Sequence, residues 1–462
     1  MTSWQPDLAS RAGPRYRAIA EALAADVRAG ALPPGTRLPT HRDLAWRLKV
    51  TVGTVSRAYA EAERRGLISG EVGRGTFVRN LGGVSPLRFH AEPMVADFVD
   101  LRVNRPRAAS EAPLMAEALG ALAADDGLDA LLEYQPHAGR PADRAAGAHW
   151  IERTSTLATD AQQVVVTASG QHAMFATLAA IAEPGDTLAV EALTYPGIRA
   201  VASLLGLKVL PIALDEAGML PEALAAACRV NRVRAVYLLP TLHNPTTVTM
   251  PVERRRAVTA IARAHDVFVI EDDVYGFLVA QPLPPLANFA PEHTFYVTST
   301  SKSLMPGLRV GYARCPPPLA ERVTAAVRAT TYSAAPIMAA VASRWIRDGT
   351  AQSLIAEKRA EAGRRQAVVH RLLPADGLCT DPAAVHFWLN LSERWRAEDF
   401  AATAERRGVG VTPAAAFAAA RQAPNAVRVC IGNPATLAEL ERGLAILAEL
   451  LKAPPDAYLS VV

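Results

Sequence analysis

The stretch Thr298–Tyr312 reads T-S-T-S-K-S-L-M-P-G-L-R-V-G-Y and places Lys302 seven residues before Arg309. Lys302 follows a short apolar run and has hydroxyl side chains on both sides. A lysine at such a strand end can form a Schiff base with a carbonyl group, and serines with an arginine can bind a phosphate. The stretch therefore predicts a Schiff-base lysine beside a phosphate pocket, and its alternative is a solvated loop lysine.

The composition indicates a globular chain with more than one domain. The chain has 462 residues, 50% of them hydrophobic, which is enough to build two or three domains. No apolar run approaches the roughly 20 residues of a membrane span, and the first residues do not resemble a secretory signal. We therefore expect a cytoplasmic protein with no membrane partner. The four scattered cysteines predict reduced thiols, and no metal site is expected.

The basic charge is concentrated near the N-terminus. Residues 1–80 contain 13 Lys and Arg against 7 Asp and Glu, whereas the rest of the chain contains 36 against 38. A local basic excess is typical of a segment that binds a polyanion. We therefore expect any nucleic-acid partner to bind the N-terminal segment.

Residues 12–79 have the pattern of a small helical domain with a two-stranded wing. Apolar residues recur at helical spacing from Tyr16 to Val27, and Thr40 and Thr51 can each cap a further helix. Glycines at 73 and 75 allow a tight turn between two short strands. The order helix, helix-turn-helix and wing predicts a DNA-binding domain.

This segment resembles the winged helix-turn-helix head of the GntR family in three motifs: L-P-T-H-R-D-L-A at 38–45, T-V-S-R-A-Y at 54–59 and G-L-I-S-G-E-V-G-R-G-T-F-V at 66–78. The resemblance implies double-stranded DNA as a partner. Val52 and Gly53 stand where many relatives carry a basic or polar side chain. The resemblance and the helix-turn-helix pattern together predict seven DNA contacts: Thr40, Arg42, Thr51, Thr54, Ser56, Arg57 and Arg74.

A Gly- and Pro-containing linker is predicted at 80–96, and the pattern changes after it. From residue 97 short Val-, Ile- and Leu-rich runs alternate with helical stretches, which indicates a mostly parallel sheet covered on both faces. The large part of this domain is expected at about 97–373. A smaller α/β part is expected at about 374–455.

Five further signals fall at predicted loops or strand ends. They are a Ser-Gly that opens a helix, an aromatic on a turn, an amide on a proline turn, an acidic strand end followed by a phenol, and an arginine on an apolar strand. Four of them have a structural alternative: only a helix cap for the Ser-Gly, a packed loop tyrosine for the aromatic, a solvated strand end for the acidic residues and a salt bridge for the arginine. The residues are Ser169, Gly170, Gln171, Tyr195, Asn244, Asp272, Tyr275 and Arg428.

In this order the residues resemble the fold-type-I aminotransferases over residues 97–455, which implies pyridoxal 5'-phosphate as the cofactor. The resemblance implies that Lys302 forms the internal aldimine, that Asp272 pairs with the pyridine nitrogen, and that Arg428 binds a substrate carboxylate. The other implied cofactor contacts are Asn244 and Tyr275 at the phenolate oxygen, Tyr195 on the ring, and Ser169, Gly170, Gln171, Ser299, Ser301 and Arg309 at the phosphate.

Three further residues complete the prediction. Tyr134 resembles a tyrosine that reaches the phosphate of the partner subunit, and Asn104 is a candidate effector contact. Thr247 departs from the family pattern, because many relatives have glycine at this place.

Head and body together resemble the MocR subfamily of GntR transcription regulators. The resemblance implies an α/β protein in which a winged helix-turn-helix is followed by a fold-type-I aminotransferase-like domain with a smaller C-terminal α/β part. It also implies a homodimer that senses an amino-compound effector, or the cofactor, through the Lys302 aldimine. Two alternatives remain open: an active aminotransferase with an accessory DNA-binding head, and a DNA-binding protein with an inactive sensor domain.

Overall fold

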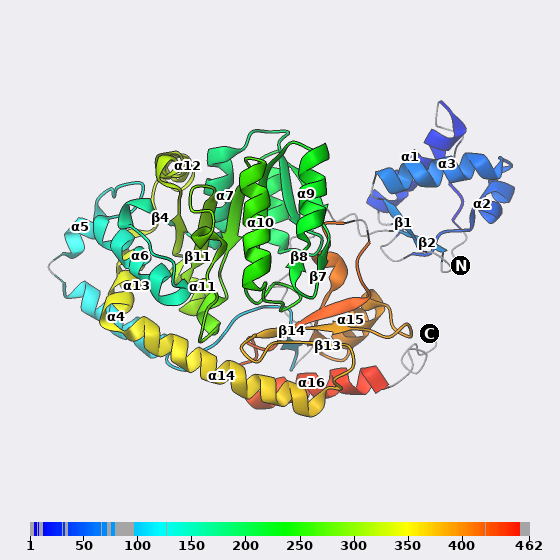
Figure 1. The fold of residues 1–462 in the computed structure, drawn as a ribbon. Coiled ribbons are helices and arrows are strands. Elements are labelled where there is room, and N and C mark those ends of the chain that lie inside the picture. Colours follow the sequence, from blue (N-terminus) through cyan, green and yellow to red (C-terminus); the bar gives the residue numbers. More distant parts are fainter. Residues whose placement is uncertain are drawn as a thin grey trace. The chain divides into compact units, whose positions relative to one another are not determined.

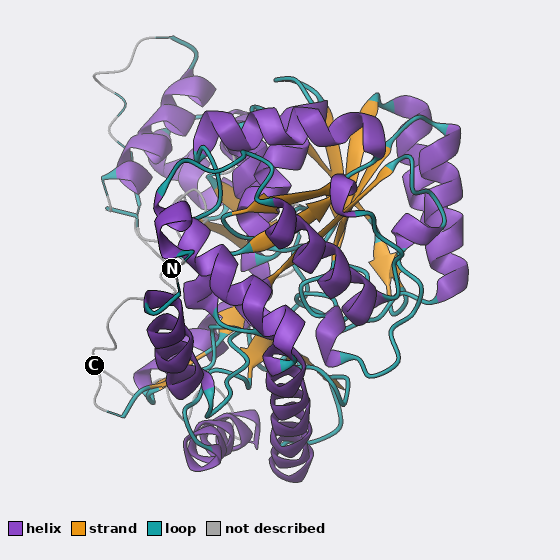
Figure 2. Ribbon diagram, turned by 90° about the vertical axis from the view of Figure 1, so that its left-hand side faces the viewer, coloured by secondary structure: helices purple, strands orange, loops and turns teal. Residues whose placement is uncertain are grey.

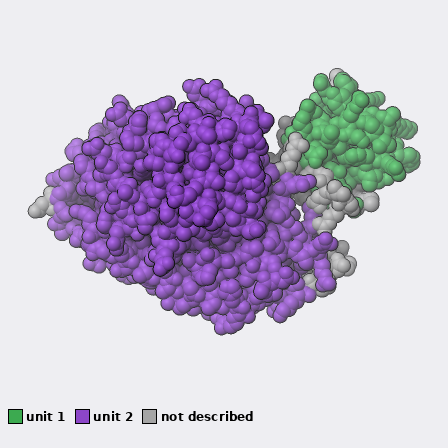
Figure 3. Space-filling model, in the orientation of Figure 1, with its two compact units in different colours: residues 1–91 green, residues 92–462 purple. Residues whose placement is uncertain are grey.

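The computed structural model describes residues 4–6, 8, 13–29, 31–32, 36–65, 67–71, 75–78, 97–125, 127–420 and 422–452. The chain separates into two compact units, Met1–Ala91 and Glu92–Val462, which we call the head and the body (Figure 3). The predicted linker at 80–96 lies outside the described residues. None of the helices in the described ranges is long and apolar enough to cross a membrane.

The head is a winged helix-turn-helix. Its elements are α1 (Arg15–Arg28), α2 (His41–Leu48), α3 (Val52–Arg64) and the antiparallel strands β1 (Ile68–Glu71) and β2 (Gly75–Val78). Both predicted caps are confirmed, because the Thr40 side chain accepts from the Asp43 N–H and the Thr51 side chain accepts from the Thr54 N–H. The chain turns between α2 and α3 at Lys49, which has a left-handed φ of 52°.

The apolar faces of the three head helices form one core. Ile19 and Leu23 of α1, Leu44 of α2, and Val55 and Tyr59 of α3 are all buried in it. Their spacing of three or four residues explains why each helix turns one face inward. The opposite faces of α2 and α3 are left for solvent or a partner.

A seven-stranded sheet forms the centre of the body (Figures 1 and 2). Its order is β4-β12-β11-β10-β9-β5-β6, and all strands are parallel except β12, which runs antiparallel to both neighbours. The strands are β4 (Val164–Thr167), β5 (Thr187–Glu191), β6 (Lys208–Ile212), β9 (Val233–Leu238), β10 (Phe268–Asp272), β11 (Thr294–Ser299) and β12 (Gly311–Arg314). The predicted mostly parallel sheet is confirmed.

Helices cover both faces of this sheet, as Figure 2 shows. On β9 and β10, Tyr237 and Ile270 pack with residues of α7, α8 and α12, whereas the alternate residues Val236 and Val269 pack with α9 and α10. Burial on both faces explains why the strands read as continuous apolar runs rather than alternating ones. The body helices before the small sheet are α4 (Glu111–Ala123), α5 (Leu128–Leu132), α6 (Pro141–Ser155), α7 (Gly170–Ile181), α8 (Pro196–Leu204), α9 (Pro221–Val230), α10 (Val252–Ala264), α11 (Thr300–Ser303), α12 (Ala320–Thr330), α13 (Pro336–Asp348) and α14 (Thr350–Leu372).

The C-terminal part of the body has a second sheet of order β13-β14-β17-β16. Its elements are β13 (Leu378–Cys379), β14 (His386–Asn390), α15 (Ala397–Arg406), β15 (Val409–Gly410), β16 (Thr412–Pro413), β17 (Ala426–Cys430) and α16 (Leu437–Lys452). The strand β3 (Val99–Asp100), which opens the described body, pairs in parallel with β15. The first described strand of the body therefore packs with the small C-terminal part, and the chain enters the large sheet only afterwards. A β-hairpin of β7 (Leu214–Asp215) and β8 (Gly218–Met219) lies apart from both sheets.

Candidate functional site

Two neighbouring strands bring Asp272 and Lys302 to the same edge of the large sheet. β10 ends at Asp272, and its neighbour β11 ends at Ser299, where α11 begins. The Ser299 side chain caps α11 by accepting from the Ser301 N–H at 3.1 Å. Because the carboxyl ends of parallel strands form the usual ligand-binding edge, this is where a cofactor site is expected.

The Lys302 amine is partly buried and donates a hydrogen bond to the Asn104 carbonyl oxygen. The pKa of Lys302 is lowered from 10.5 to about 8, mainly by burial; Cys430 and Asp272 oppose this shift, and the charges of Arg428 and Lys358 contribute to it. At neutral pH roughly a tenth of such an amine is unprotonated, compared with less than a thousandth of an ordinary lysine. The site therefore supplies the neutral amine that attack on a carbonyl requires.

The Asp272 carboxyl is buried and half satisfied. Its Oδ2 accepts from the Tyr237 hydroxyl at 2.6 Å. Its Oδ1 makes no hydrogen bond of ordinary geometry within the described part of the chain, although the Val274 N–H is close enough to lower the pKa. Burial dominates and raises the pKa of Asp272 to about 7. A buried carboxylate oxygen without a partner fits a protonated ring nitrogen, so these residues fit a pyridine cofactor.

Two predicted phenolate ligands, Tyr275 and Asn244, lie at the same edge. The Tyr275 hydroxyl accepts from the Asn104 side-chain amide at 2.9 Å, and burial raises the pKa of Tyr275. Asn244 precedes a cis peptide bond to Pro245, and its Oδ1 accepts from Arg428 Nη1 at 2.9 Å. Thr247 has φ 66°, in the region that favours glycine, which is the residue that the resemblance implied at this position.

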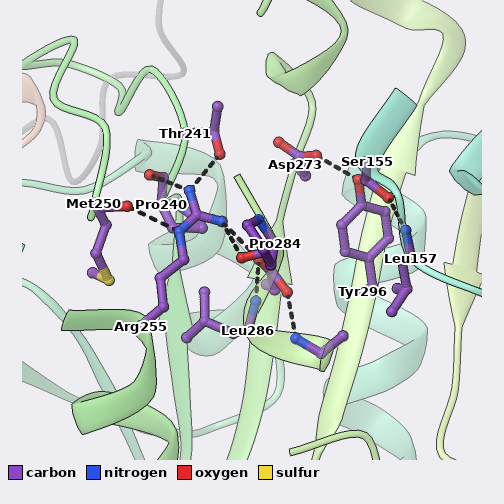
Figure 4. A network of polar contacts seen from close by, with 12 residues as sticks. Ser155, Leu157, Pro240, Thr241, Met250, Arg255, Asp273, Pro284, Leu286 and Tyr296 are labelled. Atoms are coloured by element: carbon purple, nitrogen blue, oxygen red, sulfur yellow. Dashed lines mark hydrogen bonds and ion pairs between the residues drawn. The ribbon is translucent and has the colours of Figure 1, made fainter. Parts of the chain in front are cut away.

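The buried side chain of Arg255 contacts both ends of the loop that carries Asn244, and Figure 4 shows its bonds to Pro240, Thr241 and Met250. Arg255 of α10 donates to the Met250 carbonyl at 2.9 Å, to the Thr241 hydroxyl at 2.9 Å and to the Pro240 carbonyl at 3.2 Å. Its Nη1 lies 3.7 Å from Glu271, the residue before Asp272. Arg255 therefore joins both ends of the Asn244 loop to the strand that presents Asp272.

The predicted phosphate ligands lie on two turns that approach closely. Ser169 caps α7 by accepting from the His172 N–H at 3.1 Å. A Cβ placed on Gly170 would lie 3.2 Å from the Ser299 Cβ, and one placed on Gly311 would lie 2.5 Å from the Ser169 carbonyl carbon. The last glycine of the quoted stretch is thus required for the close approach of the two turns.

The other phosphate candidates differ in how they are held. Gln171 donates from Nε2 to the Gly197 carbonyl at 2.8 Å, and Ser301 contacts the Ser299 hydroxyl at 3.0 Å. Arg309 is exposed, with a left-handed φ of 52°. Burial, and then the charge of Asp272, raise the pKa of Tyr195, whereas the charges of Arg428 and Arg309 oppose this shift.

Tyr134 lies outside the site of its own chain. Its side chain follows α5, is 87% exposed and has its ring 5.2 Å from that of Tyr332. This exposure is compatible with the predicted contact to a partner subunit, and that contact stays a prediction.

Arg428 is buried on β17 next to the cofactor residues. Its Nη2 donates to the Arg102 carbonyl at 2.5 Å, and its guanidinium lies 4.7 Å from the centre of the Phe417 ring. No carboxylate in the described ranges pairs with Arg428, so the alternative of a structural salt bridge does not apply there. A buried arginine without a carboxylate suits a ligand carboxylate.

Sequence reasoning missed two residues of this site. Tyr237, near the end of β9, bonds to Asp272, and His386 on β14 accepts from the Asn104 amide at 3.1 Å. Burial and Arg428 lower the pKa of His386 to about 3, so the ring is neutral and its Nε2 donates to the His243 carbonyl at 3.1 Å. Both residues sit within apolar strands, where tyrosine and histidine are common core residues, so no local pattern marks them.

In the head, the predicted DNA contacts divide into exposed and engaged side chains. Arg42 and Arg57 are exposed. The Thr51 and Thr54 hydroxyls bond to each other at 2.8 Å, Thr40 bonds to Asp43 at 2.7 Å, and Ser56 bonds to His41 at 3.1 Å. The engaged residues build the helix-turn-helix, and Arg42 and Arg57 stay the candidates for phosphate contacts. Arg74 lies outside the described residues.

Replacing Arg42 by alanine is expected to weaken DNA binding about tenfold for every sequence, because a charge-assisted phosphate contact contributes about 1.5 kcal/mol. The slope of log affinity against log salt should fall by about 1. Fluorescence anisotropy over a range of salt concentrations measures both. The matched control is Arg64→Ala at the far end of α3, where the arginine pairs with Glu61. A loss confined to one DNA sequence would show that Arg42 reads bases instead.

Fold and site together define a DNA-binding head joined to an aminotransferase-like body. Residues 96–444 match the family described as Aminotransferase class I and II, and residues 15–78 match Bacterial regulatory proteins, gntR family. The chain belongs to the MocR-type GntR transcription regulators, which combine these two domains. It is thus a DNA-binding transcription regulator.

Individual relatives agree with this membership. YdeF of Bacillus subtilis (strain 168), described as an uncharacterized HTH-type transcriptional regulator, is 35% identical over 450 residues, which are 97% of each chain. The vitamin B6 salvage pathway transcriptional repressor PtsJ of Salmonella typhimurium (strain LT2) is 26% identical over 384 residues, covering 83% of this chain and 86% of PtsJ. An archaeal alanine:glyoxylate aminotransferase has the same fold as the body, with a TM-score of 0.71 at 24% identity over 77% of this chain and 91% of the enzyme.

Proposed function

We propose that this regulator binds pyridoxal 5'-phosphate at Lys302 and controls DNA binding by sensing an amino compound, or the cofactor itself, at that site. The observation that carries the proposal is the pairing of a low-pKa lysine with a buried, half-satisfied carboxylate at one sheet edge. The names of two relatives also support it, since PtsJ is described with vitamin B6 salvage and PdxR of Corynebacterium glutamicum with pyridoxine biosynthesis.

When bound, pyridoxal phosphate supplies an aldehyde that amines attack and a ring that accepts electrons. Lys302 contributes the neutral amine, and Asp272 holds a proton at the ring nitrogen. Asn244 and Tyr275 orient the phenolic oxygen, while Tyr195 covers the ring. The phosphate is assigned to Ser169, Gly170, Gln171, Ser299, Ser301 and Arg309, with Tyr134 contributed by a partner subunit.

The effector is proposed to carry a carboxylate as well as an amine. The Arg428 guanidinium can bind the carboxylate through two parallel hydrogen bonds, and the buried Asn104 Oδ1 offers an additional acceptor. Binding of such a compound would favour one arrangement of the body over another only if its contacts differ between them. In a homodimer, this preference would change how two heads engage paired half-sites on DNA.

Footprinting tests the regulatory proposal. The full chain is mixed with its own upstream DNA, alone, with pyridoxal phosphate, and with pyridoxal phosphate plus a panel of amino acids and amines. Protection is expected at paired half-sites, with a pattern that depends on the additions. If no site is protected under any of these conditions, the proposal fails.

An amino-acceptor assay tests the alternative of an active aminotransferase. This alternative is considered because every predicted site residue for the reaction is present in the sequence. The loaded protein is mixed with each amino compound and a keto acid, and product is counted per protein chain. At most one turnover per chain is expected from a sensor. Continuous turnover at 1–10³ per second would favour the enzyme.

A further inference from the structure

A second lysine lies buried behind the turn that carries Lys302. Lys358 of α14 is 1% exposed, and its ammonium donates to the Leu304 carbonyl and, at 3.3 Å, to the Lys302 carbonyl. Its third contact is Glu111 Oε1 at 2.9 Å. The ammonium therefore bonds to two backbone carbonyls of the cofactor-binding turn and forms an ion pair with Glu111.

The charges around Lys358 form a row that ends near the cofactor site. Glu111 is buried at the start of α4, and its other oxygen accepts from Arg105 Nη2 at 3.1 Å. Arg105, Glu111 and Lys358 together carry one net positive charge. Glu357, the neighbour of Lys358, is bonded instead to the Ser110 hydroxyl at 2.5 Å and to the Ala109 N–H at 2.6 Å.

Besides burial, groups on three elements influence the protonation of the Lys302 amine. Asp272 of β10 stabilises its protonated form, whereas Arg428 of β17 and Lys358 of α14 oppose it, and the Cys430 thiol is also close. Burying an ammonium costs several kcal/mol unless it is well paired. A neutral donor could form the same hydrogen bonds to two backbone carbonyls. These bonds alone therefore do not explain why Lys358 carries a charge at this place.

We propose that Lys358 is a positioning residue for the cofactor lysine: it fixes the turn through the Lys302 and Leu304 carbonyls, and the net positive charge that it shares with Arg105 and Glu111 favours the unprotonated Lys302 nitrogen. The proposal rests on the proposed cofactor function and extends it to a residue that makes no assigned contact with the cofactor. The sequence alone contains no sign of it, because Lys358 lies in the middle of a long, charged helix.

The test is a pH titration of the visible absorbance band of the full chain loaded with pyridoxal phosphate. Lys358→Met should raise the midpoint of the titration by about one pH unit, as expected for loss of a unit charge at an effective dielectric constant near 20. Lys358→Arg keeps the charge and should titrate near the wild-type midpoint. Lys358→Met combined with Glu111→Gln removes both charges and should recover at least half of the upward shift.

Three results would overturn the proposal. The first is a Lys358→Met variant that has the band but an unchanged midpoint, and the second is an equal upward shift in Lys358→Arg, which would indicate lost packing rather than lost charge. If Lys358→Met does not fold, the titration midpoint of Glu111→Gln is compared with that of the double variant. Equal midpoints in these two variants would be the third result that overturns the proposal. A wild-type chain without any band would instead contradict the proposed cofactor function, so the two failures are distinguishable.

Discussion

Lys302→Ala is expected to abolish the visible absorbance band of the pyridoxal-phosphate-loaded protein completely, because no other side chain at the site offers an amine positioned to join the aldehyde. Borohydride reduction of the wild type should fix the cofactor to the peptide containing Lys302, and reduction of the variant should fix none. Absorbance spectra and peptide mass spectrometry measure the two effects. We expect the variant to fold normally, since removing a partly buried, low-pKa amine relieves a desolvation cost.

The matched control is Lys208→Ala, which removes an exposed lysine from the edge strand β6. This variant should keep the full band. If Lys302→Ala also keeps it, the lysine assignment is wrong and another of the five lysines in the chain carries the cofactor. The Lys302 variant further separates sensing from DNA binding, because its head is unchanged and its footprint should lose only the dependence on cofactor.

Asp272→Asn should weaken pyridoxal phosphate binding roughly a hundredfold, because removing one partner of a buried ion pair costs about 3 kcal/mol. Asparagine preserves the shape of the side chain and can still bond to the Tyr237 hydroxyl, so the loss would report the charge. Equilibrium titration of the band amplitude with cofactor measures the affinity. An affinity within twofold of the wild type would show that Asp272 does not pair with the ring nitrogen.

The same substitution should stabilise the cofactor-free protein above neutral pH. Because burial raises the pKa of Asp272 to about 7, the folded chain keeps a proton that the unfolded chain has lost above about pH 4. The free energy of unfolding of the wild type therefore falls as pH rises from about 4 to 7, and Asp272→Asn avoids this loss. The gain should reach a few kcal/mol at pH 8 and shrink toward pH 4.

Thermal melts of the cofactor-free variants across this pH range check the stability change. Asp376→Asn, in an exposed turn after α14, serves as the control and should melt like the wild type. Higher stability combined with weaker cofactor binding would show that Asp272 strengthens cofactor binding and lowers the stability of the cofactor-free protein. If the variant melts below the wild type at pH 8, the carboxylate contributes to the fold in a way that burial alone does not explain.

Much of the fold was predictable because its signals are local. The caps at Thr40 and Thr51, the helical spacing of the head and the apolar runs of the large sheet each depend on residues within a few positions of one another. The reversed direction of β12 was not predictable in this way. A buried strand of four residues reads the same in either direction, so its antiparallel pairing with β11 is seen only in the structure.

For the candidate site, the sequence alone determined which chemical groups are available. Lys302 with its hydroxyl neighbours, Asp272 at a strand end, and the basic helix-turn-helix can be named from order and spacing, because these residues must occupy strand ends and turns whatever the final packing. The tertiary structure alone decided their electrostatic character. The low pKa of Lys302 and the raised pKa of Asp272 arise mainly from burial, with smaller contributions from Lys358, Arg428 and other groups distant in sequence. Desolvation and charge act through space, so only the folded arrangement, in which α14, β17 and the first body segment meet behind one sheet edge, determines the strength of these effects.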